Sequence, residues 1–176
     1  MKEISFTLNN ELRSVSVDAN EVLLDVLREK LGVKSPKCGC ERGDCGACTV
    51  LLDGKAVRSC LVLAIEVENH NIVTVEGISA EKLSALQEAF IEYNAFQCGY
   101  CAPGIILAIT ELLLKHPHPT LEQIKESIAG NLCRCTGYTP IFDAIMALTS
   151  VEQHSDAAKE IPSQERRPAL PVEEGK

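Results

Sequence analysis

The sequence lacks several features that would assign it to a common class of protein. It contains no tryptophan, and aromatic residues make up only 4% of its 176 positions. Its formal net charge is −8 at pH 7, so it lacks the basic surface that nucleic-acid binding requires. The longest apolar run, 105–114, is interrupted by Thr110 and Glu111 and is too short to span a bilayer. We therefore expect no nucleic-acid partner and no membrane insertion.

Signals for export and for catalysis are also missing. The first residues alternate as in a β-strand and contain neither the apolar region of a signal peptide nor a twin-arginine motif, so we expect a cytoplasmic protein. No catalytic triad and no paired carboxylate site can be recognised. The glycine-rich segment 39–46 lacks the Lys-Ser/Thr of a phosphate-binding loop. We expect no catalytic site in this chain alone.

Cysteine, in contrast, is abundant. The chain has nine cysteines and a hydrophobic content of 45%, which is enough to form a core without disulfides. In a reducing compartment, clustered cysteines are more often metal ligands than disulfide partners. The cysteine pattern is therefore the main guide to function.

The first set of cysteines has the C-x4-C-x2-C…C spacing of a plant-type ferredoxin, which binds one [2Fe–2S] cluster. It comprises Cys40, Cys45, Cys48 and Cys60. Two tetrahedral irons need two thiolates each, and glycines allow the loop to curl around them with its N–H groups facing the sulfurs. Zinc or a disulfide pair fits this spacing less well, because zinc sites usually combine two C-x2-C pairs or a pair with histidines.

Cys38 is one cysteine more than this pattern needs. It is separated from Cys45 by six residues, so Cys40 is the better ligand. We expect Cys38 to be a free thiol beside the loop; the alternative is a substitute ligand for a damaged cluster.

The second set of cysteines combines a C-x2-C and a C-x-C motif, each at a junction between predicted helices. It comprises Cys98, Cys101, Cys133 and Cys135. On its own, an all-cysteine site of this kind could also bind zinc. Beside a plant-type loop, a second [2Fe–2S] cluster is favoured. Two clusters in one small acidic chain indicate an electron carrier.

The N-terminal part of the sequence predicts a compact α+β domain. Alternation and turn signals predict hairpins over 3–17 and 49–59, the second with an Asp-Gly turn. An apolar helical face predicts a helix over 22–31, ended by Gly32, and a last strand follows over 72–75. This order is compatible with a β-grasp ferredoxin, although the pattern alone does not select that fold.

After residue 77, the apolar residues recur at helical spacing, which predicts a small four-helix bundle. Pro103 begins the second helix, Thr120 caps the third together with Gln123, and Thr139-Pro140 begins the fourth. The residues expected on the buried faces are Leu83, Leu86, Phe90, Tyr93, Ile105, Ile106, Ile109, Leu112, Leu113, Leu121, Ile124, Ile128, Ile141, Ala144, Ile145 and Leu148. The segment 151–176 is rich in proline and charge, and we expect it to be disordered or docked on a partner.

Three motifs occur in a fixed order: CERGDCGACTVLLDG at 40–54, QCGYCAPG at 97–104 and NLCRCTGY at 131–138. With these motifs, the sequence resembles the iron–sulfur subunit of the xanthine dehydrogenase/aldehyde oxidase family of molybdenum hydroxylases. The resemblance covers roughly residues 3–150. It implies a β-grasp, plant-type ferredoxin domain, which we assign to 1–77, and a four-helix [2Fe–2S] domain, assigned to 78–150.

The resemblance also implies partners and a reaction. The partners are a large molybdopterin-binding subunit and a medium FAD-binding subunit, in a dimer of heterotrimers. The reaction is hydroxylation of a carbon centre with water as the oxygen source. Electrons pass from the molybdopterin centre through both clusters to FAD. The expected substrate is a purine or another N-heterocycle; aldehydes or carbon monoxide are alternatives. A free-standing two-cluster carrier and a structural zinc module are alternatives from other functional classes.

The resemblance assigns roles to the candidate ligands. It implies that the second set of cysteines holds the cluster nearer the molybdenum cofactor, and that the first set holds the cluster nearer the flavin. Gln97 and Cys135 match family positions that approach the pterin from this subunit. For Gln97, the alternative is a hydrogen bond within its own chain.

Overall fold

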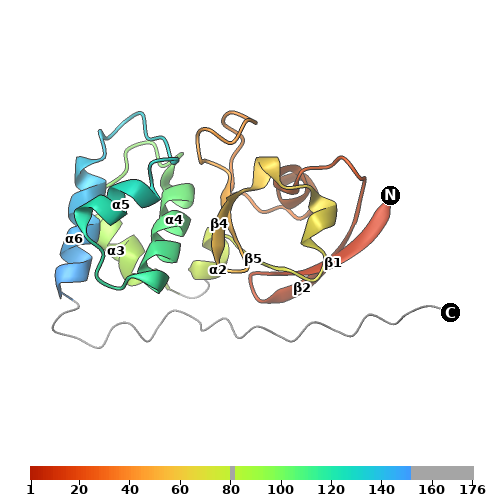
Figure 1. The fold of residues 1–176 in the computed structure, drawn as a ribbon, viewed down its shortest axis with the longest axis horizontal. Helices are drawn as coiled ribbons and strands as arrows, with labels where there is room; N and C mark the ends of the chain where they lie inside the picture. The colour runs from red at the N-terminus through yellow and green to blue at the C-terminus, as the bar shows by residue number, and fades with distance from the viewer. Residues whose placement is uncertain (80–81, 152–176) are drawn as a thin grey trace.

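The structure is a computed structural model that describes residues 1–79 and 82–151. A five-stranded sheet with its short helices forms one part, and a group of helices forms the other, beside it (Figure 1). The expectation for 151–176 lies outside the described residues, except that Val151 is the last residue of a helix. No helix in the described part of the chain is long and apolar enough to cross a membrane.

The sheet is built from two hairpins and a later strand that joins them. Its strands are β1 (Lys2–Leu8), β2 (Glu11–Val17), β3 (Thr49–Leu52), β4 (Lys55–Arg58) and β5 (Asn71–Val73). The order is β2-β1-β5-β3-β4, with β1 and β5 parallel and the other pairs antiparallel. Asp53 and Gly54 make the predicted tight turn with φ of 48° and 78°. The predicted α+β, β-grasp architecture is confirmed.

The helix that packs on this sheet is less regular than predicted. It begins as α1 (Leu23–Asp25) and continues as a π-helical segment, η1 (Val26–Lys30), in which the N–H of Leu31 donates to the carbonyl of Val26 over 3.1 Å. Its apolar side is fully buried with Ile4 and Phe6 of β1. Gly32, at φ 70°, ends the helix as predicted. Two 3-10 turns, η2 (Ser59–Leu61) and η3 (Ala64–Val67), lead from β4 towards β5.

The second part contains the four predicted helices and one short helix that was not predicted. The elements are α2 (Val75–Ile78), α3 (Ala85–Glu92), α4 (Ala102–Lys115), α5 (Leu121–Ser127) and α6 (Thr139–Val151). The predicted capping box of Thr120 and Gln123 is present. Val75 belongs to α2 and not to a strand. The reason is that Thr74 bonds to the side chains of Asn9 and Glu76, outside the strand ladder.

Most of the predicted apolar faces are buried in the helical core, but three residues are not. Leu83, Tyr93 and Leu121 are 43%, 41% and 39% exposed, so their prediction as core residues is wrong. They stand just before α3, at the end of α3 and at the first position of α5. Side chains at helix ends have fewer neighbours to cover them than side chains in the middle turns, which periodicity alone does not reveal.

The two parts meet along α4. This helix lies on the side of the helical part that faces the sheet and contacts β3 and β4 (Figure 1). Glu111 of α4 accepts a hydrogen bond from the backbone N–H of Ala56 in β4 at 2.9 Å. This packing brings the loops that carry the two sets of cysteines together.

Candidate metal centres

The four cysteines of the first set form two pairs. The β3–β4 hairpin places Cys48 beside Cys60, with their sulfurs 3.4 Å apart. Ser59 holds this end of the hairpin closed, since its hydroxyl donates to the carbonyl of Cys48 over 2.7 Å. Cys40 and Cys45 form the other pair, in which the Cys45 N–H donates to the Cys40 sulfur over 3.4 Å. The hairpin and the loop before it therefore bring all four thiols to one place.

The loop around Cys40 is suited to hold a thiolate. The backbone N–H of Arg42 donates to the Cys40 sulfur over 3.5 Å, as does that of Cys45. These hydrogen bonds, led by the one from Arg42, lower the pKa of Cys40 to about 7. The turns depend on positive φ at Glu41 and Gly43. Burial has the opposite effect on Cys60 and raises its pKa to about 11. Coordination to a metal would deprotonate such a thiol outright.

The second set of cysteines repeats this arrangement. Cys98 and Cys135 have their sulfurs 3.6 Å apart, and Cys101 contacts Cys133 through a side-chain hydrogen bond. Burial, followed by that hydrogen bond, raises the pKa of Cys101 to about 12. Tyr138 fixes the backbone at Cys133, because its hydroxyl accepts from the Cys133 N–H over 2.8 Å. Each pair joins one thiol from the segment before α4 to one from the segment before α6, so the two segments bring four thiols together.

The paired sulfurs have the spacing of two thiolates on one tetrahedral metal. Two thiolates on one tetrahedral metal, with bonds of about 2.3 Å, lie roughly 3.7 Å apart, close to both sulfur–sulfur distances in the structure. All nine cysteines are free thiols and not disulfides. Within 1–79 and 82–151, no three His, Cys, Asp or Glu side chains surround a point that could hold one metal ion. Each set thus offers two pairs of thiols, one pair for each iron that a [2Fe–2S] cluster would place there.

Gln97 and Cys135 lie together at the surface. The Gln97 amide donates to the carbonyl of Cys135 over 3.2 Å, so the hydrogen bond is made within its own chain. Both residues are exposed, as is Cys98. This edge of the second set is open to a partner, whereas Cys101 is buried.

Cys38 stands apart from both sets. Its exposed sulfur donates to the carboxylate of Glu41 at 3.0 Å. That hydrogen bond is the main reason why the pKa of Cys38 rises to about 11. Its neighbour Cys40 ionises far more readily, and its sulfur is the one that receives the backbone N–H groups.

Replacing Cys38 by serine should leave both clusters in place. The hydroxyl of serine can keep the hydrogen bond to Glu41, and no thiol of either set is disturbed. Electron paramagnetic resonance (EPR) of the reduced protein should show two iron–sulfur signals of wild-type intensity. Loss of either signal would show that Cys38 is a ligand and that the assignment of Cys40 is wrong.

The two sets are connected by hydrogen bonds to backbone carbonyl groups. The N–H of Leu132, next to Cys133, donates to the carbonyl of Cys45 at 2.9 Å. The hydroxyl of Tyr100, between two cysteines of the second set, donates to the carbonyl of Cys38 at 2.6 Å. Each hydrogen bond joins a residue beside or within one set directly to the loop of the other set.

A buried asparagine, Asn131, makes hydrogen bonds across the contact between the two parts, which we call the seam and which includes Gly46, Thr49, Arg58 and Gly130. Asn131 is 1% exposed, and its amide donates to the carbonyl of Gly46 over 3.1 Å and to the hydroxyl of Thr49 over 3.2 Å. Its oxygen accepts from Arg58 over 3.3 Å. Sequence reasoning did not identify Asn131 or Arg58 as important. The only signal was the place of Asn131 directly before the ligand motif.

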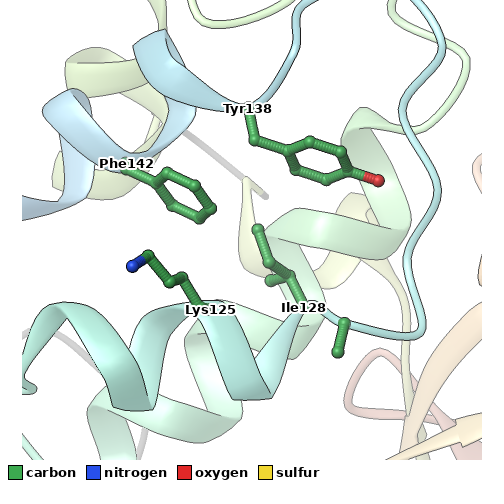
Figure 2. Close-up of a pocket in the computed structure, with 5 residues that line it drawn as sticks. Lys125, Ile128, Tyr138 and Phe142 are labelled. Atoms are coloured by element: carbon green, nitrogen blue, oxygen red, sulfur yellow. The ribbon is translucent and has the colours of Figure 1, made fainter.

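A pocket of about 270 Å³ lies between α5 and α6, away from the thiols. Lys125, Ile128, Tyr138 and Phe142 surround it, and the tyrosine hydroxyl points away from its centre (Figure 2). No cysteine lines this pocket, so it is separate from both candidate metal centres.

Comparison with known proteins agrees with this geometry. Residues 6–74 match a family described as a 2Fe-2S iron-sulfur cluster binding domain, and residues 74–146 match a [2Fe-2S] binding domain. The chain is 50% identical over 144 residues to the nicotine 6-hydroxylase small subunit of Paenarthrobacter nicotinovorans, covering 82% of this chain and 87% of that one. It is 48% identical over 143 residues to the nicotinate dehydrogenase small FeS subunit of Eubacterium barkeri, covering 81% and 91%.

A solved structure shows the same fold. The match is a chain of quinoline 2-oxidoreductase from Pseudomonas putida 86, with a TM-score of 0.82 and 43% identity, covering 88% of this chain and 97% of that one. Two cluster-binding domains in this order, and relatives named as the small subunits of a hydroxylase and a dehydrogenase, bear out the resemblance noted in the sequence. The chain therefore belongs to the iron–sulfur subunits of the xanthine dehydrogenase/aldehyde oxidase family of molybdenum hydroxylases.

Proposed function

We propose that this chain carries electrons from a molybdopterin centre in a large subunit to FAD in a medium subunit, through two [2Fe–2S] clusters. The observation that carries the proposal is the arrangement of eight thiols in two sets of two pairs. When bound, the clusters supply one-electron carriers. The chain itself holds the thiols, excludes water from the buried ligands and fixes the distance between the two sets.

The short hydrogen-bonded connection between the two sets supports a relay. From the Cys45 carbonyl, one hydrogen bond and one peptide unit lead to Cys133, by way of the Leu132 N–H. The parts that carry the two sets pack directly against each other, since α4 contacts β3 and β4 of the sheet. The separate hydrophobic cores support two cluster-binding units, which we assign to 1–77 and 78–150; α2 crosses this boundary, because Val75 and Ile78 both pack on the helical core.

We place the second set of cysteines nearer the molybdenum subunit. Support comes from the exposure of Cys98, Cys135 and Gln97, which leaves this edge accessible to a partner. We assign Gln97 and Cys135 to contact with the pterin. The amide of Gln97 can turn its remaining hydrogen-bonding groups outward while it holds the carbonyl of Cys135. The first set of cysteines then faces the flavin subunit.

The substrate we favour is a nitrogen heterocycle, including purines. The reasons are that two similar subunits come from enzymes named for nicotine and nicotinate, and that the similar structure comes from an enzyme named for quinoline. We expect the protein to be cytoplasmic, since this number of free cysteines suits a reducing compartment. We also expect the complex to be a dimer of heterotrimers.

A pull-down of the tagged chain from its own cells tests the proposal. Mass spectrometry should find two further chains, and the complex should contain molybdenum and FAD. The isolated complex should then oxidise members of a panel of purines, pyridines and quinolines faster than aldehydes or carbon monoxide. Gel filtration should give the mass of two heterotrimers.

Other results would redirect the assignment. If the chain is purified alone with both clusters, it is a free-standing carrier. If the chain contains zinc and no iron, it is a structural module. A preference for aldehydes would keep the relay but contradict the proposed substrate class.

A further inference from the structure

Arg58 makes hydrogen bonds to residues from both cysteine-bearing segments, near the first set and near the second. Its guanidinium donates to the hydroxyl of Thr49 over 2.8 Å and to the carbonyl of Gly130 over 2.8 Å. A longer hydrogen bond of 3.3 Å reaches the side-chain oxygen of Asn131. One planar group thus joins β3 of the sheet to the loop after α5.

Each of these contacts is close in the chain to a candidate ligand. Thr49 directly follows Cys48, and Arg58 itself is two residues before Cys60. On the other side, Asn131 is two residues before Cys133. The guanidinium therefore lies where the two parts meet and contacts residues that lie close in the chain to ligands of both sets.

The positive charge in this seam is not neutralised by a carboxylate. In the described part of the chain, no Asp or Glu forms an ion pair with Arg58, and the acceptors that it contacts are a hydroxyl, a carbonyl and an amide. The side chain is half-buried. Water screens a charge less effectively there than on an open surface, so its field acts on nearby groups.

The guanidinium also packs closely against the backbone of Gly130. A Cβ atom on Gly130 would lie 2.5 Å from a guanidinium nitrogen. A lysine ammonium could retain the charge but could not make the same forked contacts, because it is a single point donor on a flexible stem. Position and charge can therefore be tested separately at this site.

We propose that Arg58 serves both centres at once, holding their loops at a fixed separation and raising the reduction potential of both clusters. The inference rests on the proposed relay function. Reduction adds one electron, and hence one negative charge, to each cluster. An uncompensated cation between them favours the reduced state of both and counters the repulsion between the two added electrons.

Redox titration of the purified complex, followed by EPR, tests this role. Arg58→Gln removes the charge and should shift both midpoint potentials downward. Arg58→Lys keeps the charge but not the fork, so it should lower the melting temperature while the potentials stay close to wild type. Arg13→Gln is the matched control. It removes the same unit charge from the exposed surface of β2, where a change in net charge alone should have no measurable effect on either potential.

The outcomes separate this inference from the function on which it rests. If the wild-type complex has no iron–sulfur signals, the proposed function fails. If those signals are present but Arg58→Gln leaves both potentials unchanged, the role of Arg58 is refuted and the relay stands. If Arg58→Gln does not retain its clusters, Arg58→Met removes the charge with a side chain of similar length: a fall in both potentials supports the charge effect, and potentials near wild type overturn it. A clear fall in both potentials in Arg58→Lys, which keeps the charge, would also overturn it.

Discussion

Replacing Cys60 by alanine is expected to abolish one of the two clusters and leave the other intact. Cys60 is buried beside Cys48, with the two sulfurs 3.4 Å apart. Iron should fall from about four to about two atoms per chain, because each [2Fe–2S] centre holds two. The electron route should be cut, so turnover with an acceptor served by the flavin should be lost. Metal analysis and EPR of the reduced complex measure both effects.

The matched variant is Cys101→Ala, which removes a buried thiol from the second set of cysteines. It should eliminate the other EPR signal and keep the one that Cys60→Ala loses. If the two centres are independent, each variant should remove one EPR signal, and the two variants should remove different signals. If both variants lost the same signal, the eight cysteines would not form two separate sites.

A methyl group at position 46 is expected to destabilise the whole chain. Gly46 has φ 72°, and a Cβ there would lie 2.4 Å from the carbonyl oxygen of Gly130 and 2.6 Å from the amide nitrogen of Asn131. The left-handed backbone costs about 1 kcal/mol for alanine and the overpacking about 1–3 kcal/mol more. The melting temperature of the cluster-loaded chain should fall by roughly 5–15 °C.

Gly32→Ala is the control for the backbone contribution. Gly32 has a similar φ of 70°, but a Cβ there would meet nothing within 4 Å. It should cost only the backbone strain, about 1 kcal/mol. Equal melting temperatures for the two variants would mean that the seam between the two parts is not tightly packed. A much larger fall for Gly46→Ala would support a rigid connection between the two sites.

The local elements could be predicted because their signals are local. Turn residues at Asp53-Gly54 and the capping box at Thr120 act within a few residues, so the hairpin and helix that they begin or end were found. Cysteine spacing defined both sets of candidate ligands, because a cluster needs four thiolates at fixed separations. The long motifs then restricted the family.

The seam could not be predicted because it depends on contacts between distant segments. Asn131 lies 85 positions from Gly46, and Arg58 lies 72 positions from Gly130. The hydrophobic periodicity of a local segment therefore predicts neither hydrogen bond. The π-helical segment η1 also escaped prediction, since its sequence reads as an ordinary apolar helix face. The seam depends on how the two parts pack, and η1 on how its helix packs on the sheet, and the order of residues in the chain reveals neither.

The most direct test of the account is the iron, acid-labile sulfide and zinc content of the purified chain, measured together with EPR after reduction. Two [2Fe–2S] clusters predict about four irons and four sulfides per chain, no stoichiometric zinc, and two distinct signals of equal integrated intensity. Stoichiometric zinc, a disulfide between any two of the eight cysteines, or a single signal would contradict it.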